Sequence, residues 1–274
     1  MISVDQIFNN QYYKKSNWIY LLIPFSIIFY CISILKNYLY KNGFLKRIKI
    51  KVPVLIIGNI TLGGTGKTPL ALNLITKFLN EGLNPALISR GYGGSAKNIT
   101  EVHESSNARS VGDEALLIKA KSKIPVFIGK NRVNVAKILL KKYPKTSIII
   151  SDDGLQHHRL ARDYEIIVVD SKRKFGNGFI FPAGPLRESR SRLNLVDAVV
   201  YKGSINNSKF YQMKYITKHF KNFVTSKKIL FEGIQDKKIV AITAIGNPES
   251  FFSTLEGYNL EFKKVIFNDH YFFN

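Results

Sequence analysis

The chain has 274 residues, 45% of them hydrophobic, so it is long enough for one large domain or two modest ones with real cores. Glycine and proline occur at ordinary levels, which excludes a fibrous protein and argues against a disordered one. The single cysteine, Cys31, excludes an internal disulfide and the cysteine-based zinc motifs.

Lysine and arginine outnumber aspartate and glutamate by 41 to 19, and the formal net charge is +22. Such an excess favours polyanionic partners, namely nucleic acid, an anionic membrane surface or phosphorylated substrates. The lysines are spread along the chain, so a genomic bias in composition explains the charge about equally well. Because the sequence contains neither zinc-finger spacing nor an aromatic RNP run, we expect no nucleic acid partner.

Residues 16–35 (SNWIYLLIPFSIIFYCISIL) form twenty positions without a charged side chain. A helix of that length covers about 30 Å, the thickness of the hydrocarbon layer of a bilayer. Apolar residues occur all round the helix, which indicates a membrane-associated segment rather than an ordinary surface helix. Pro24 could kink it, and the pattern leaves open whether the segment spans the bilayer or dips into it.

Positive charges are more numerous after this apolar segment than before it. The positive-inside rule therefore places the rest of the chain on the cytoplasmic side, where ATP is found. From Val52 onwards, short apolar runs such as VPVLIIGN (52–59) and YEIIVVD (164–170) alternate with helical patterns such as 68–82 and 131–144. This alternation predicts an α/β fold with a parallel sheet and helices on both faces.

The stretch TLGGTGKT (61–68) follows a predicted strand and opens a predicted helix, as a phosphate-binding P-loop does. Thr61 replaces the usual first glycine, but three glycines remain to turn backbone N–H groups towards a phosphate. Lys67 would reach the terminal phosphates, and the Thr68 hydroxyl would ligate Mg²⁺. The predicted nucleotide-binding residues are Thr61, Leu62, Gly63, Gly64, Thr65, Gly66, Lys67 and Thr68.

Two adjacent carboxylates, Asp152 and Asp153, end the apolar strand 146–151, the usual position of a Walker B aspartate. Together with the P-loop they predict a magnesium site that also includes Thr68. His157 and His158 follow closely, and because adjacent side chains point in different directions they favour polar or substrate contacts over zinc.

The sequence resembles the tetraacyldisaccharide 4'-kinase family, the lipid A 4'-kinases. The resemblance rests on GNITLGGTGKTP, ISRGYGG, VGDEALL, SDDGLQHHRLARD, FPAGPLRE and FNDHYFF, which occur in family order along nearly the whole chain. Threonine at position 61 is usual in this family. The resemblance implies ATP-dependent phosphorylation of the 4' hydroxyl of a tetraacylated glucosamine disaccharide 1-phosphate at the cytoplasmic face of the inner membrane.

The resemblance also implies residue roles. Asp113 in VGDE is the expected base for the acceptor hydroxyl, and His270 in NDHY is expected to pair with it. Without the family, Asp113 would be interpreted as a helix cap. Asp152 and Asp153 are expected to hold Mg²⁺, and the further candidate site residues are Gln156, His157, Arg187 and Glu188.

We expect a membrane-associated segment over residues 1–45, a P-loop kinase core over 46–235 and the start of a smaller C-terminal α/β lobe over 236–274, with the active site between core and lobe. Because family members continue past the Asp-His-Tyr motif, we expect the lobe to be incomplete. The expected partners are the disaccharide lipid and the anionic inner-membrane surface, the expected cofactors are ATP and Mg²⁺, and the expected state is a monomer.

The alternative function is a membrane-associated P-loop ATPase of the partition or septum-placement type, without a lipid substrate. Such ATPases carry a lysine directly before the paired glycines of the loop. Leu62 occupies that position here, so the sequence argues against this alternative.

Overall fold

The computed structural model describes residues 12–13, 17–205, 209–217, 219–234, 237–245, 247–267 and 271. The chain forms two compact units: a core unit, Phe8–Met213, and a second unit made of Met1–Ile7 and Lys214–Asn274. The boundaries that we expect at residues 45 and 235 concern functional regions and stay a prediction. His270 lies outside the described residues.

The core unit contains an eight-stranded sheet in the order β3-β4-β2-β5-β1-β6-β7-β8. Only β3, at one edge, is antiparallel to its neighbour. The strands are β1 (Val54–Gly58), β2 (Pro85–Ser89), β3 (Thr100–Glu101), β4 (Val126–Ile128), β5 (Ile148–Asp152), β6 (Tyr164–Asp170), β7 (Ala198–Lys202) and β8 (Tyr211–Met213).

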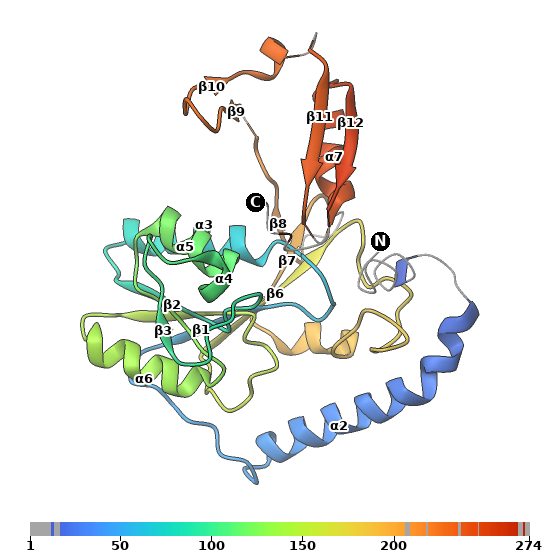
Figure 1. Cartoon of the computed structure of the whole chain (residues 1–274). Coiled ribbons are helices and arrows are strands. Elements are labelled where there is room, and N and C mark those ends of the chain that lie inside the picture. Colours follow the sequence, from blue (N-terminus) through green and yellow to red (C-terminus); the bar gives the residue numbers. More distant parts are fainter. Residues whose placement is uncertain are drawn as a thin grey trace. The chain divides into compact units, whose positions relative to one another are not determined.

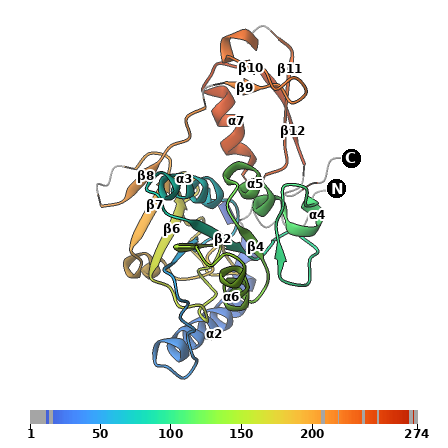
Figure 2. The same ribbon diagram turned by 90° about the vertical axis from the view of Figure 1, so that its left-hand side faces the viewer.

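Helices cover both faces of this sheet, as Figures 1 and 2 show. One apolar layer packs α3 and α5 against the strands, and the opposite layer packs α6. Isoleucines in the central strands are fully buried, which a parallel sheet covered on both sides requires. The predicted α/β fold is confirmed. The helices are α3 (Lys67–Asn80), α4 (Ala108–Val111), α5 (Asp113–Ser122), α6 (Arg132–Lys142) and the short 3₁₀ helix η2 (Arg190–Leu195).

Strand β1 lies at the centre of the sheet, between β5 and β6. The chain passes from β5 across β1 to β6, so the strand order reverses there. Ile57, next to the last residue of β1, pairs in register with Asp152 at the end of β5. In open parallel sheets, ligands bind beyond the carboxyl ends of the strands at such a switch point. The segments after β1 and β5 therefore occupy the place where a ligand is expected.

The apolar N-terminal segment forms a 3₁₀ helix, η1 (Asn17–Leu22), followed by α2 (Ile23–Lys41). Pro24 lies in the first turn of α2, where the missing N–H costs no hydrogen bond, so it begins the helix instead of kinking its interior. The region Trp18–Lys41 is long and apolar enough to cross a membrane, judged by length and composition alone.

One side of α2 packs on the core unit, and Figure 1 shows the helix running along it. The Ala183 N–H donates to the Ser26 hydroxyl over 2.9 Å, and the rings of Phe29 and Phe181 meet edge to face at 5.6 Å. Near the end of the helix, the ring of Tyr40 lies 5.7 Å from that of His158. The helix is therefore attached to the core along most of its length.

The second unit has its own small core around Phe252, with Phe231, Leu255 and Leu260. A parallel pair, β11 (Ile239–Thr243) and β12 (Phe262–Ile266), is connected by α7 (Pro248–Glu256). The second unit therefore has the α/β character expected of the C-terminal lobe. Before it come an antiparallel hairpin, β9 (Phe220–Lys221) and β10 (Lys228–Ile229), and the 3₁₀ helix η3 (Phe231–Ile234).

Candidate functional site

The glycine-rich loop after β1 turns directly into α3, which begins at Lys67. Gly63 and Gly66 have φ values of 93° and 97°, which favour glycine because a side chain would be strained there. Thr61 instead forms an isolated bridge with Leu186 and does not have a positive φ. A threonine at this position therefore costs the loop nothing, while the N-terminus of α3 offers its N–H groups to an anion.

The loop is paired through its backbone to residues 185–187. The Leu62 N–H donates to the Pro185 carbonyl over 2.7 Å, and the Arg187 N–H donates to the Ile60 carbonyl over 2.7 Å. These two bonds fix the backbone of Arg187 beside the loop. A residue more than a hundred positions away in sequence thus belongs to the same site.

Asp153 connects the loop to Arg187. Its carboxylate lies 3.4 Å from the Lys67 ammonium on one side and 3.3 Å from the Arg187 guanidinium on the other. Burial alone would raise the pKa of Asp153, but the two cations outweigh burial and hold that pKa below its ordinary value. The residue has a φ of 47°, a conformation that non-glycine residues adopt rarely and most often at functional sites.

Asp152, its neighbour, is almost completely buried, with 1% of its surface exposed. Burial, together with the negative charge of Glu114, raises the pKa of Asp152 to about 7, although Lys67 opposes the shift. The influence of Glu114 means that the start of α5 lies close to the end of β5. Sequence reasoning did not assign Glu114 to the site, and the only signal was its position next to Asp113.

Asp113 begins α5 and is exposed. The turn before it depends on Gly112, whose φ is 86° and where an added Cβ would lie 2.4 Å from the Tyr92 carbonyl oxygen. The glycine-rich segment after β2 therefore packs directly under this turn. The Glu114 N–H donates to the Asp113 carboxylate over 2.9 Å. That bond orients the carboxylate, whereas the N-cap position of α5 is Gly112, which has no side chain to cap the helix.

Arg132, the first residue of α6, is a second residue that sequence reasoning missed. It is buried, its Nη1 donates to the Gly129 carbonyl over 3.0 Å, and its Nε has no hydrogen-bond partner among the described residues. Burial lowers its pKa to about 10, although the nearby charges of Asp153 and Asp152 favour the cation. A buried cation beside two carboxylates is suited to a site that binds more negative charge.

The donor set at the end of β5 fits Mg²⁺. In the described ranges, no three His, Cys, Asp or Glu side chains gather into a preformed metal site. Magnesium does not need one, since it is commonly held by one or two carboxylates, water and the phosphates of a substrate. Asp152 and Asp153 provide the carboxylates, and the Thr68 hydroxyl lies in the first turn of α3.

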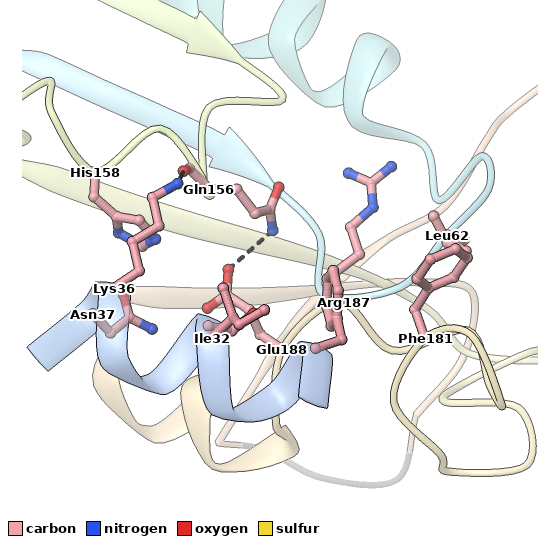
Figure 3. Close-up of a pocket in the computed structure, with 11 residues that line it drawn as sticks. Ile32, Lys36, Asn37, Leu62, Gln156, His158, Phe181, Arg187 and Glu188 are labelled. Atoms are coloured by element: carbon pink, nitrogen blue, oxygen red, sulfur yellow. Dashed lines mark hydrogen bonds between the residues drawn. The ribbon is translucent and has the colours of Figure 1, made fainter. Parts of the chain in front are cut away.

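A pocket of about 400 Å³ adjoins the phosphate loop under α2. Figure 3 shows α2 along one side, with Lys36 and Gln156 close together and Gln156 directed at Glu188. The Lys36 ammonium donates to the Gln156 carbonyl over 3.4 Å, and the Gln156 amide donates to Glu188 over 2.9 Å. The residues that line the pocket include Ile32, Lys36, Leu62, Gln156, His158, Arg187 and Glu188.

Of the further candidate residues, Gln156, Arg187 and Glu188 line this pocket, whereas His157 is not part of its lining. The pocket instead contains His158, which the sequence pattern did not separate from its neighbour. The Nε2 of His157 is buried and has no hydrogen-bond partner within the described residues. Burial and nearby cations lower the pKa of each histidine to about 4, so both are neutral at pH 7.

A network of buried ion pairs holds residues that line the pocket in place. Arg162 donates to the carbonyls of Leu155 and His157, over 3.0 and 2.7 Å, and pairs with Glu165. Arg192 also pairs with Glu165, and its Nε lies 3.3 Å from Glu188. The network therefore fixes both the turn that bears Gln156 and the carboxylate that Gln156 contacts.

The position of the loop at the switch point of the sheet, with the Lys67–Asp153 pair beside it, defines the class: this is a P-loop protein built for phosphoryl chemistry. The comparison with known sequences is more specific. The tetraacyldisaccharide-1-P 4'-kinase (LpxK) family matches residues 18–274, and the chain belongs to this family.

Individual relatives agree with this assignment. A tetraacyldisaccharide 4'-kinase of Methylobacillus flagellatus is 39% identical over 98% of this chain and 81% of its own length. One from Shewanella woodyi is 41% identical over 94% and 74%. The crystal structure of the "apo" form of LpxK from Aquifex aeolicus in complex with ATP is similar with a TM-score of 0.75 and 27% identity, over 92% of this chain and 82% of that one.

Family membership makes the chain a kinase of lipid A biosynthesis, and it confirms the resemblance and the function predicted from the sequence. The alternative, a partition-type ATPase without a lipid substrate, is not favoured.

Proposed function

We propose that the core unit transfers the γ-phosphate of ATP to the 4' hydroxyl of a tetraacyldisaccharide 1-phosphate, with the sugar held in the pocket under α2. The observation that carries this proposal is Arg187. Its side chain lines the pocket and also pairs with Asp153, which pairs with Lys67 of the phosphate loop. Two successive ion pairs, Arg187–Asp153 and Asp153–Lys67, therefore connect the pocket to the loop.

On the nucleotide side, the backbone of residues 61–68 and the N-terminus of α3 bind the phosphates, and Lys67 contacts the terminal ones. Thr68, Asp152 and Asp153 would hold Mg²⁺, which when bound neutralises charge on the transferred group. Arg132, buried beside the aspartates, adds a fixed positive charge where negative charge accumulates.

In the transfer, a bond forms between the 4' oxygen and the γ-phosphorus, and the bond between the γ-phosphorus and the bridging oxygen breaks. The hydroxyl proton passes to the carboxylate of Asp113. Three features support Asp113 in this role: it is exposed, it is oriented by the Glu114 N–H, and it lies on the turn fixed by Gly112. Its pairing with His270, which the resemblance implies, stays a prediction.

On the lipid side, the pocket has a largely apolar lining that includes Phe29, Ile32, Leu62 and Phe181, and it adds the cations Lys36 and Arg187 and the polar groups of Gln156, His158 and Glu188. Such a set can bind sugar hydroxyls and a phosphate. The volume of about 400 Å³ accommodates part of a sugar headgroup and leaves the acyl chains outside.

We further propose that α2 lies in the cytoplasmic interface of the inner membrane and does not span it. The core contacts leave an apolar stripe exposed at helical spacing. A helix attached along one side to a polar unit can immerse only its other side. The stripe consists of Leu21, Phe25, Ile28 and Leu35, which are 76, 60, 57 and 57% exposed.

The test is label transfer. Membranes that contain the protein are incubated with γ-labelled ATP and the disaccharide lipid, and labelled lipid and released phosphate are both measured. We expect labelled lipid, and we expect Asp113→Asn to lower its rate by roughly 10²- to 10⁴-fold while ATP binding is retained. The control is Glu104→Gln, an exposed acid outside the site. Phosphate release without labelled lipid would overturn the proposal in favour of an ATPase.

A further inference from the structure

The hairpin of the second unit has an apolar tip. Phe223 and Val224, in the loop between β9 and β10, are 100% and 89% exposed (Figure 1 labels both strands). The loop that presents them is well organised. The Asn222 carboxamide oxygen accepts from the Val224 N–H over 3.0 Å and from the Thr225 N–H over 2.7 Å, and Ser226 closes the turn with a φ of 57°. The tip is therefore held outward by local hydrogen bonds.

The base of the hairpin is anchored by aromatic packing. Phe220 of β9 meets Phe231 with their ring centroids 4.7 Å apart, and Phe231 stacks on Tyr258 at 3.6 Å. Phe231 belongs to the apolar cluster at the centre of the second unit. The hairpin is thus an integral part of that unit, and its apolar tip is not among the residues of the cluster.

The charge around the tip has one sign. Residues 198–231 contain seven lysines and no aspartate or glutamate. Three of these lysines, Lys221, Lys227 and Lys228, directly flank the tip in the two strands and the loop. A structured apolar tip flanked by cations complements a bilayer, which has an apolar interior beneath anionic headgroups.

We propose that this hairpin is a second membrane contact, in which Phe223 and Val224 insert into an anionic bilayer and the neighbouring lysines bind its headgroups. The contact is separate from α2, which belongs to the core unit, and it does not depend on which residues perform the phosphoryl transfer. Two linked contacts bind a surface more strongly than either alone, so the hairpin would attach the second unit to the bilayer that holds the substrate.

The sequence allows a direct test, because Trp18 is the only tryptophan. In the full chain carrying Trp18→Phe and Phe223→Trp, the sole tryptophan reports on the tip. On vesicles of phosphatidylethanolamine and phosphatidylglycerol we expect its emission to shift to the blue and to be quenched at least twofold by brominated acyl chains. Vesicles of phosphatidylcholine alone should give a weaker effect.

The matched control carries Trp18→Phe and Ile242→Trp, which places the reporter at another exposed apolar position of the same unit. We expect neither a shift nor quenching there. Replacing Lys221, Lys227 and Lys228 by glutamine should reduce the tip signal. The proposal is overturned if the tryptophan of the Phe223→Trp variant stays unquenched on anionic vesicles that have bound the protein, or if its emission shifts only when a second protein is added.

Discussion

The two sides of the candidate site are built in different ways. The nucleotide side is one continuous loop, 61–68, joined to the ends of two adjacent strands, and much of its binding surface is backbone N–H. The pocket side is made of side chains from segments far apart in sequence: Lys36 on α2, Gln156 after β5, and Arg187 with Glu188. The difference teaches that the proposed phosphate site needs only the geometry of one sheet and one loop, whereas the proposed lipid pocket forms only where the N-terminal helix packs against the core.

Of the two sides, the nucleotide side should give the larger effect. Lys67→Ala removes the cation that pairs with Asp153 and that we propose contacts the phosphates, and we expect phosphoryl transfer to fall on the order of 10²- to 10³-fold. The KM for the lipid should change little, because Lys67 does not line the pocket. Rates are measured with both substrates varied, and Lys77→Ala, an exposed lysine of the same helix, serves as the control. If the KM for the lipid rose by as large a factor as the transfer rate fell, the nucleotide side and the pocket side would not act independently.

The pocket side should give a smaller and different effect. Lys36→Ala removes a cation from the pocket without touching the phosphate loop, so the KM for the lipid should rise by roughly 10-fold, as expected for a lost hydrogen bond to a charged group. The KM for ATP should stay the same. Lys41→Ala, in the last turn of α2, is the control for general membrane attraction. If Lys36→Ala and Lys41→Ala raise the KM for the lipid equally, the effect reflects general membrane attraction and not binding of the lipid in the pocket.

The smallest effect concerns the dependence of the protein's stability on pH. His157 and His158 each have a pKa of about 4 in the folded chain, below the ordinary value of 6.5, because burial disfavours the charged form. The unfolded chain therefore binds more protons between about pH 6.5 and pH 4, and the two histidines make the protein less stable as the pH falls through that window.

Replacing both histidines by glutamine should remove this part of the pH dependence. The free energy of unfolding is measured in detergent for the native chain and the variant from pH 7 to pH 4, and their difference is followed. A difference that stays constant over the whole range would contradict the assigned pKa values, whatever the absolute stability of the variant.

Sequence reasoning predicted the α/β elements and the glycine-rich turn before α3 well, because these depend on local pattern. The apolar, β-branched runs before Gly58 and Asp152 can only be covered strands, and glycines with positive φ are needed where Gly63 and Gly66 occur. Asp113 became a candidate base through the family resemblance alone, since an acid at a helix start is ordinarily a cap. Sequence reasoning missed Glu114 and Arg132. Glu114 lies at the start of α5 and Arg132 at the start of α6, and only the tertiary structure brings these helix starts near the end of β5.

The sequence by itself indicated a phosphate-binding loop at residues 61–68, an apolar segment before the core and the family of the lipid A 4'-kinases. Each of these features is encoded in a contiguous stretch of sequence, where the spacing of residue types determines the backbone conformation. The tertiary structure decided that Arg187 connects the phosphate loop to a pocket, that His158 and not His157 lines it, and that α2 packs along the core. These depend on the register of the sheet and on side-chain packing between distant segments, which no local pattern specifies.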